Sequence, residues 1–187
     1  NRGEIAAAAE GRLPRLVTLN DIRGDLQTHT TASDGMSDLE TMVRAAHERG
    51  YAYVAITDHS RHIGITNGLD PERLSAQMDA IDRLNEQLEG FVVLKGCEVD
   101  IREDGTLALP DDTLTRLDVV IGAVHSHFEL SREAQTERIL RAMDHPCLHI
   151  LAHPTGRMIG QRPPYDVDMP RVIAAARSPG GGRSRRR

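Results

Sequence analysis

Five short apolar runs recur along the chain, and four of them end in histidine while the fifth ends in glutamate. Between the runs, apolar residues follow helical spacing, so the runs are expected to be the buried strands of a parallel sheet. They occupy residues 22–29, 53–59, 92–98, 119–125 and 148–153. In barrels of such strands, the side chains at the carboxyl ends converge. The pattern therefore predicts one cluster made of His29, His59, Glu98, His125 and His153.

Capping signals predict four helices that alternate with these strands. Ser37 begins a Ser-Asp-Leu-Glu capping box, and Asp70-Pro71 pairs a cap with proline at the first helical position. Ser131 is the expected cap of a third helix, and a fourth begins at Asp168. Strands alternating with helices predict an α/β fold with right-handed crossovers.

Outside the alternating region, both ends of the chain have a different character. Residues 1–20 resemble a linker, and residues 177–187 form a basic Gly/Ser/Arg tail that we expect to be disordered. Residues 21–176 have the size of one domain. The chain also begins without Met, which favours a linker continuing from something upstream.

Composition narrows the class of protein. With 39% hydrophobic and 27% charged residues the chain is typical of globular domains, and 3% aromatic residues argue against a base-stacking platform. The net charge of −5 argues against a DNA binder that acts by charge alone, although bound divalent cations would reverse the charge locally. Two isolated cysteines, no apolar stretch of about 20 residues and no secretory signal predict a cytoplasmic protein without membrane contact.

Imidazole and carboxylate groups on rigid strand ends are typical ligands of first-row divalent metals. Asp34 follows His29 closely and Asp58 precedes His59, so there are enough ligands for more than one ion, with Glu98 able to bridge two. A metal pair lowers the pKa of water and holds the oxygens of an in-line displacement at phosphorus. The predicted chemistry is phosphoester hydrolysis.

Each of these residues also has a structural interpretation when taken alone. Asp58 fits a loop cap, Glu98 fits an ion pair with Arg102, and His153 fits a turn before proline. Repetition at five strand ends favours the functional interpretation. His127 is expected near the site, whereas Arg157 fits a phosphate contact and an ordinary surface position equally well.

The motifs around these residues resemble those of the PHP (polymerase and histidinol phosphatase) family. They are Asp-Leu-Gln-Thr-His-Thr at 25–30 with Ser-Asp-Gly at 33–35, Ile-Thr-Asp-His-Ser at 56–60, Gly-Cys-Glu-Val-Asp at 96–100, Val-His-Ser at 124–126 and His-Pro-Thr-Gly-Arg at 153–157. Within the family they are most similar to the C-terminal PHP domain of bacterial family X DNA polymerases. The resemblance implies a distorted seven-stranded (β/α) barrel, of which residues 21–176 would supply about five strands.

The resemblance also implies roles, cofactors and partners. His29 would belong to a first metal site, Glu98 would bridge, His125 and His153 would complete a second site, and Asp34 and His59 would hold a third ion. Asp58 and His127 would support the ligands or handle protons, and Arg157 would orient the phosphate. The implied activity is a Mn2+-dependent 3′–5′ exonuclease acting on DNA 3′ ends, with polymerase domains upstream; Zn2+, Mg2+ or Fe2+ serve other branches.

Two departures from the family pattern leave alternatives open. Gln27 stands where many members have a first histidine, and the last strands and final Asp-x-His motif are not found beyond Ala176. The chain is therefore expected to be truncated at both ends, with the first and third metal sites each short of one ligand. The alternatives are a histidinol-phosphatase-like enzyme for small molecules and a catalytically impaired fragment. An open barrel edge favours aggregation or dimerisation without fixing the oligomeric state.

Overall fold

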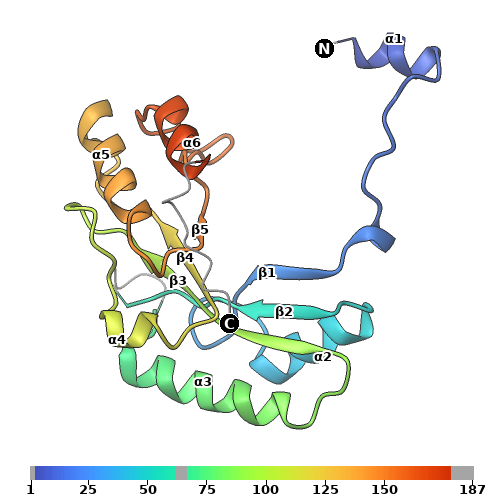
Figure 1. Ribbon diagram of the computed structural model, residues 1–187, viewed down its shortest axis with the longest axis vertical. Helices are drawn as coiled ribbons and strands as arrows, with labels where there is room; N and C mark the ends of the chain where they lie inside the picture. Colours follow the sequence, from blue (N-terminus) through green and yellow to red (C-terminus); the bar gives the residue numbers. More distant parts are fainter. Residues whose placement is uncertain (1–2, 62–66, 178–187) are drawn as a thin grey trace.

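The computed structural model describes residues 3–61 and 67–177, and a five-stranded sheet lies at its centre (Figure 1). Every neighbouring pair of strands is parallel, and the spatial order follows the order along the chain. The strands are β1 (Gly24–Thr28), β2 (Tyr53–Ile56), β3 (Val92–Asp100), β4 (Val119–Ala123) and β5 (Ile150–Leu151). The sheet curls into a half-barrel with helices between its strands, which confirms the predicted α/β architecture.

The four longest helices begin at side-chain caps that satisfy their first free N–H groups. Their bounds are α1 (Glu4–Ala9), α2 (Leu39–Glu48), α3 (Pro71–Asn85), α4 (Asp111–Leu114), α5 (Arg132–Met143) and α6 (Met169–Arg177), with a 3-10 turn at Leu19–Asp21. Asp70 and Ser131 cap α3 and α5 as predicted. The predicted cap at Ser37 is wrong, because the carboxylate of Asp38 accepts the Thr41 N–H at 2.8 Å.

Helices α2 and α3 cover the β1–β2–β3 part of the sheet, and α5 and α6 pack together beside β4 and β5 (Figure 1). Alternation along β4 divides its side chains between the two faces. Val120 packs in the core beneath the helices, whereas Ile121 and Ala123 belong to a separate cluster on the other face. That second cluster also contains Ala55 and Ala152, so three of its five buried side chains are alanine.

The N-terminal segment does not pack as a domain of its own. Helix α1 contains no buried residue and stands apart from the sheet (Figure 1). The extended segment that follows exposes apolar side chains such as Leu16 and Val17. The predicted disordered tail lies outside the described residues except for Arg177, which ends α6. Within 3–61 and 67–177, no helix has the length and apolarity needed to cross a membrane.

The parallel arrangement brings the carboxyl ends of the strands to one edge of the sheet. His29 directly follows β1, Asp58 and His59 follow β2, and Glu98 lies near the end of β3. A parallel bridge between His59 and Glu98 extends the β2–β3 pairing beyond the strand proper. The predicted residues therefore come from neighbouring strands at a single edge.

Candidate metal centre

Glu98 is the centre of the cluster, because its carboxylate is buried and both oxygens face imidazole rings. Oε1 lies 2.9 Å from Nε2 of His153 and 3.2 Å from Nε2 of His125. Oε2 lies 3.2 Å from Nε2 of His29 and 4.0 Å from Nδ1 of His59. The carboxylate is therefore shared between two groups of imidazoles, one at each oxygen.

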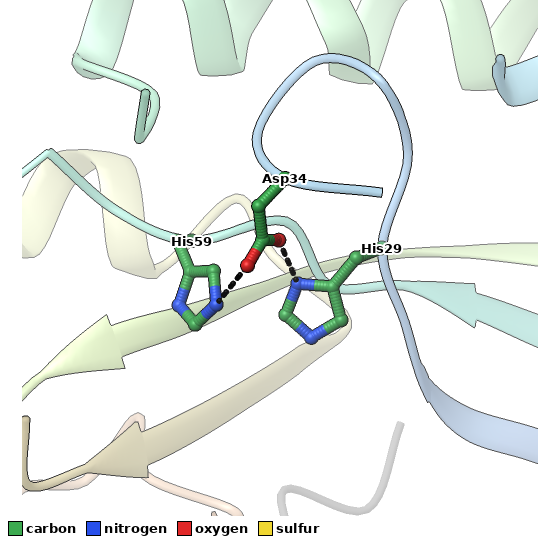
Figure 2. A group of neighbouring side chains, drawn as sticks. All are labelled: His29, Asp34 and His59. Carbon is green, nitrogen blue, oxygen red and sulfur yellow. Dashed lines mark ion pairs between the residues drawn. The ribbon is translucent and has the colours of Figure 1, made fainter. Parts of the chain in front are cut away.

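Asp34 joins the two rings on the Oε2 side from the loop that follows β1 (Figure 2). Its Oδ1 lies 3.3 Å from Nδ1 of His29, and its Oδ2 lies 3.4 Å from Nε2 of His59. The loop approaches the strand end closely, since a Cβ at Gly35 would collide with the backbone oxygen of His29. Glycine at this position thus lets the loop turn Asp34 toward the two histidines.

Gln27 also reaches Glu98, from the same face of β1 as His29. Its Nε2 donates a hydrogen bond of 2.7 Å to Oε2 of Glu98. The amide cannot act there as an imidazole would, so it supplies a neutral donor to the carboxylate. The structural alternative for Glu98, an ion pair with Arg102, is not formed, because Arg102 donates to the carbonyl oxygens of Leu107 and Ala108 instead.

The charges around Glu98 are strongly coupled. Burial disfavours ionised Glu98, but hydrogen bonds from His125, His153 and His29 hold its pKa well below the usual range. The hydrogen bond to Glu98 raises the pKa of His29 despite burial. Burial lowers the pKa of His59 in spite of the nearby carboxylates, which favours a neutral ring with a lone pair for a ligand.

Asp100 holds His125 in place and was missed as a site residue by the sequence analysis. Its Oδ1 lies 2.8 Å from Nδ1 of His125, while Ser60 Oγ donates to Oδ2 at 3.3 Å. Burial disfavours charged His125, but the hydrogen bonds to Asp100 and Glu98 raise its pKa to about 9. The sequence feature that could have identified it is the alternation of side chains along β3, which puts Asp100 two residues beyond Glu98 and on the same face.

Asp58 does not face the ligand atoms but anchors the loop that presents Asp34. The fully buried carboxylate accepts hydrogen bonds from the N–H and hydroxyl of Thr30, both at 2.7 Å, and from Ser33 Oγ at 2.5 Å. Gln77 Nε2 on α3 donates to it at 2.6 Å. The structural interpretation of Asp58 as a loop anchor therefore fits these contacts.

The remaining candidates lie farther out along the loops. Nδ1 of His127 faces Glu103 at 3.7 Å and Glu129 at 4.0 Å rather than Glu98. Arg157 lies with Arg162 in the rim of a surface hollow formed by residues 157–163.

His153 has a φ of 25°, and this left-handed conformation is unfavourable for a residue with a Cβ. The surrounding turn therefore imposes the backbone geometry that brings His153 to Glu98.

The donor set fits a divalent metal. In the part of the chain that the structure describes, ligand atoms of His29, Asp34 and His59 lie within 4.8 Å of one another, as do those of His59, Glu98 and His125. Nδ1 of His29 is buried and makes no hydrogen bond, and a bound ion would satisfy this otherwise unpartnered nitrogen. Mixed imidazole and carboxylate donors suit Mn2+, Fe2+ or Zn2+.

Comparison with known families agrees with this geometry. The model of the PHP domain family matches residues 25–159, which contain every ligand candidate. The chain belongs to the PHP domain family. Membership supports a hydrolase of phosphoesters and a metal-binding role for the His/Asp/Glu groups.

Two curated relatives show how far the similarity extends. The chain is 44% identical over 162 residues to the DNA polymerase/3′-5′ exonuclease PolX of Bacillus subtilis, covering 87% of the chain and 28% of that protein. It is 32% identical over 167 residues to a probable phosphatase of Thermoanaerobacter sp., covering 83% of the chain and 61% of the relative. The chain thus spans less than two thirds of the length of either protein.

Proposed function

We propose that the chain is a metal-dependent phosphoesterase that removes nucleotides or blocking groups from DNA 3′ ends, with Mn2+ as its cofactor. The observation that carries the proposal is the position of Glu98 between two groups of imidazoles, one at each carboxylate oxygen. This arrangement suits two ions that share one carboxylate. The similarity to PolX supports the DNA substrate.

The residues have distinct tasks in this proposal. His125 and His153 would hold an ion with Oε1 of Glu98, and His29, Asp34 and His59 would hold ions on the Oε2 side. When bound, the ions supply an acidified water and neutralise charge on the phosphate. Every other task falls to the protein.

The supporting groups position those ligands. Asp58 holds the loop of Asp34, and Asp100 fixes Nδ1 of His125 so that Nε2 points to Glu98. Arg157, in the loop after His153, would contact the phosphate from the solvent side. The Asp34 and His153 side chains are 46% and 45% exposed, so the centre opens to solvent at the sheet edge. An open centre suits the end of a polymer.

The test compares two substrates in the presence of Mn2+: single-stranded DNA and small phosphate monoesters. Release of nucleotides from DNA that disappears in Glu98→Gln is the expected result, since the amide cannot bridge two cations. The matched control is His47→Gln, which alters an exposed histidine on α2 outside the cluster. No nucleotide release from DNA under any divalent metal would refute the proposed function.

A second candidate is hydrolysis of small phosphate monoesters. It is favoured by the relatives named probable phosphatases, of which the chain covers a larger share than it does of PolX. Turnover of monoesters alone, lost in Glu98→Gln, would establish this activity in place of the exonuclease.

We further propose that the chain acts in the cytoplasm and, in its parent protein, downstream of polymerase domains. The similarity to PolX supports this arrangement, because the chain matches only 28% of that protein. Joined domains would keep the DNA end at a high effective concentration near the metal centre.

A further inference from the structure

Arg138 on α5 is a buried cation with an unusual set of partners. Its side chain is 2% exposed, and among the described residues no carboxylate oxygen lies within ion-pair distance of it. The guanidinium instead donates to the carbonyl oxygens of Arg102 at 2.9 Å, Ser126 at 2.8 Å and Ile101. Because burying an unpaired charge is costly, these carbonyl dipoles must replace a carboxylate.

The positions of these carbonyl groups connect Arg138 to the metal centre. Ile101 immediately follows Asp100, and Ser126 immediately follows His125. The guanidinium thus spans the ends of β3 and β4 one residue beyond the hydrogen bond between Asp100 and His125.

Beyond that point the segments that follow β3 and β4 separate. The last backbone hydrogen bond between them joins Ile101 N–H to the Ala123 carbonyl at 2.8 Å. After it, Ile101 forms an antiparallel bridge with Leu107 in its own segment, while the segment after β4 turns at His127 with a φ of 54°. The planar guanidinium of Arg138 links these two segments beyond the last hydrogen bond of the sheet.

We propose that Arg138 is a positioning residue that fixes the separation of the β3 and β4 ends and thereby aims His125 at Glu98. The fork holds the backbone on both sides of the Asp100–His125 hydrogen bond. With Nδ1 fixed by Asp100, Nε2 of His125 is left to face Glu98 at 3.2 Å. The consequence for metal binding rests on the proposed function, whereas the geometric claim does not.

Arg141 provides a matched control on the same helix. It lies three residues farther along α5 and donates to one carbonyl oxygen, that of Asp104, at 2.7 Å. Asp104 belongs to the same turn after β3, and its carbonyl lies outside the Asp100–His125 pair that Arg138 spans. Replacing Arg141 removes a similar link from helix to turn without touching the strand ends.

The test is Arg138→Lys, which keeps the charge but loses the planar fork. In metal-free protein, the Nδ1–H proton of His125 is observed by NMR and assigned by its disappearance in Asp100→Asn. We expect this signal to broaden through solvent exchange and the affinity for Mn2+ to fall about 10- to 100-fold, as is usual when support of a ligand is lost. In Arg141→Lys both measurements should stay within about twofold of the wild type.

Unchanged signal and Mn2+ affinity in folded Arg138→Lys would overturn the inference. If that variant does not fold, Gln135→Met is decisive, because Gln135 Oε1 accepts from Nη1 of Arg138 at 3.4 Å and its buried Nε2 has no partner. The apolar replacement should preserve the fold, and the proposal requires a signal change and about a threefold loss of affinity. A wild-type protein that binds no Mn2+, but whose His125 signal still depends on Arg138, would refute only the proposed function.

Discussion

Replacement of Asp100 by asparagine should destabilise the metal-free protein at low pH and have little effect at high pH. The substitution preserves the shape of a buried side chain and removes the charge 2.8 Å from Nδ1 of His125. Because folding raises the pKa of His125 from 6.5 to about 9, the imidazolium contributes its full stability below about pH 6.5. That contribution is lost as the pH rises through about 9.

The size of the effect follows from the shift. A rise from 6.5 to about 9 corresponds to about 3.4 kcal/mol. Asp100 and Glu98 share the raising effect, and 26% of the His125 side chain remains exposed to screening solvent. Asp100 should therefore account for about 1–1.5 kcal/mol of the unfolding free energy at about pH 6.

The assay is urea unfolding in the presence of a chelator, followed by circular dichroism at about pH 6 and about pH 9.5. The control is Asp79→Asn, an exposed position on α3 that makes the same change in charge. The reasoning is refuted if Asp100→Asn lowers the unfolding free energy equally at both pH values. Such a result would mean that the aspartate stabilises by packing and not through the charge on His125.

Three further predictions concern caps, acid and metal. Asp38→Ala should lower the unfolding free energy by about 1 kcal/mol and Ser37→Ala should not, because Asp38 accepts the Thr41 N–H. Equal losses of unfolding free energy in urea for the two variants would contradict this prediction. Folding lowers the pKa of Glu98 from 4.5, so ionised Glu98 stabilises the fold above that pH and this stabilisation is lost on acidification. Acid unfolding should therefore occur at a lower pH in the wild type than in Glu98→Ala. The reverse order would contradict the predicted direction of the pKa shift. Mn2+ at about 100 times its dissociation constant should add about 2.7 kcal/mol to the unfolding free energy of the wild type and should not stabilise Glu98→Gln. The measurement is thermal unfolding of both proteins with Mn2+ and with EDTA.

The strands and most caps could be predicted because their signals are local. An apolar run followed by a histidine identifies a strand end, and Asp70 before Pro71 identifies a helix start. The cap of α2 was misplaced because Ser37 and Asp38 are adjacent and both are suitable. The short helices α1 and α4 were missed, since one contains no buried residue and the other is only four residues long.

The supporting residues could not be predicted because their partners are distant in sequence. Asp100 acts on a residue 25 positions away, and Arg138 acts on carbonyl groups 36 and 37 positions away. No spacing rule connects an arginine in a helix to the end of a strand in another part of the chain. The partners of Asp58 could not be predicted for the same reason, since only the folded loop shows that its oxygens accept hydrogen bonds from Thr30 and Gln77.

The position of Glu98 between two pairs of histidines follows from the strand order itself. With the order β1-β2-β3-β4-β5, the carboxylate comes from the central strand and two histidine-bearing strand ends lie on each side of it. Consecutive rings of the four histidines His29, His59, His125 and His153 are 4.5, 5.1 and 5.2 Å apart, so they form an arc around the carboxylate. A slip of one residue in β3 would turn Glu98 to the helix-covered face and remove the shared ligand from every ring at once. The candidate metal centre therefore depends on the register of β3 more than on any single histidine.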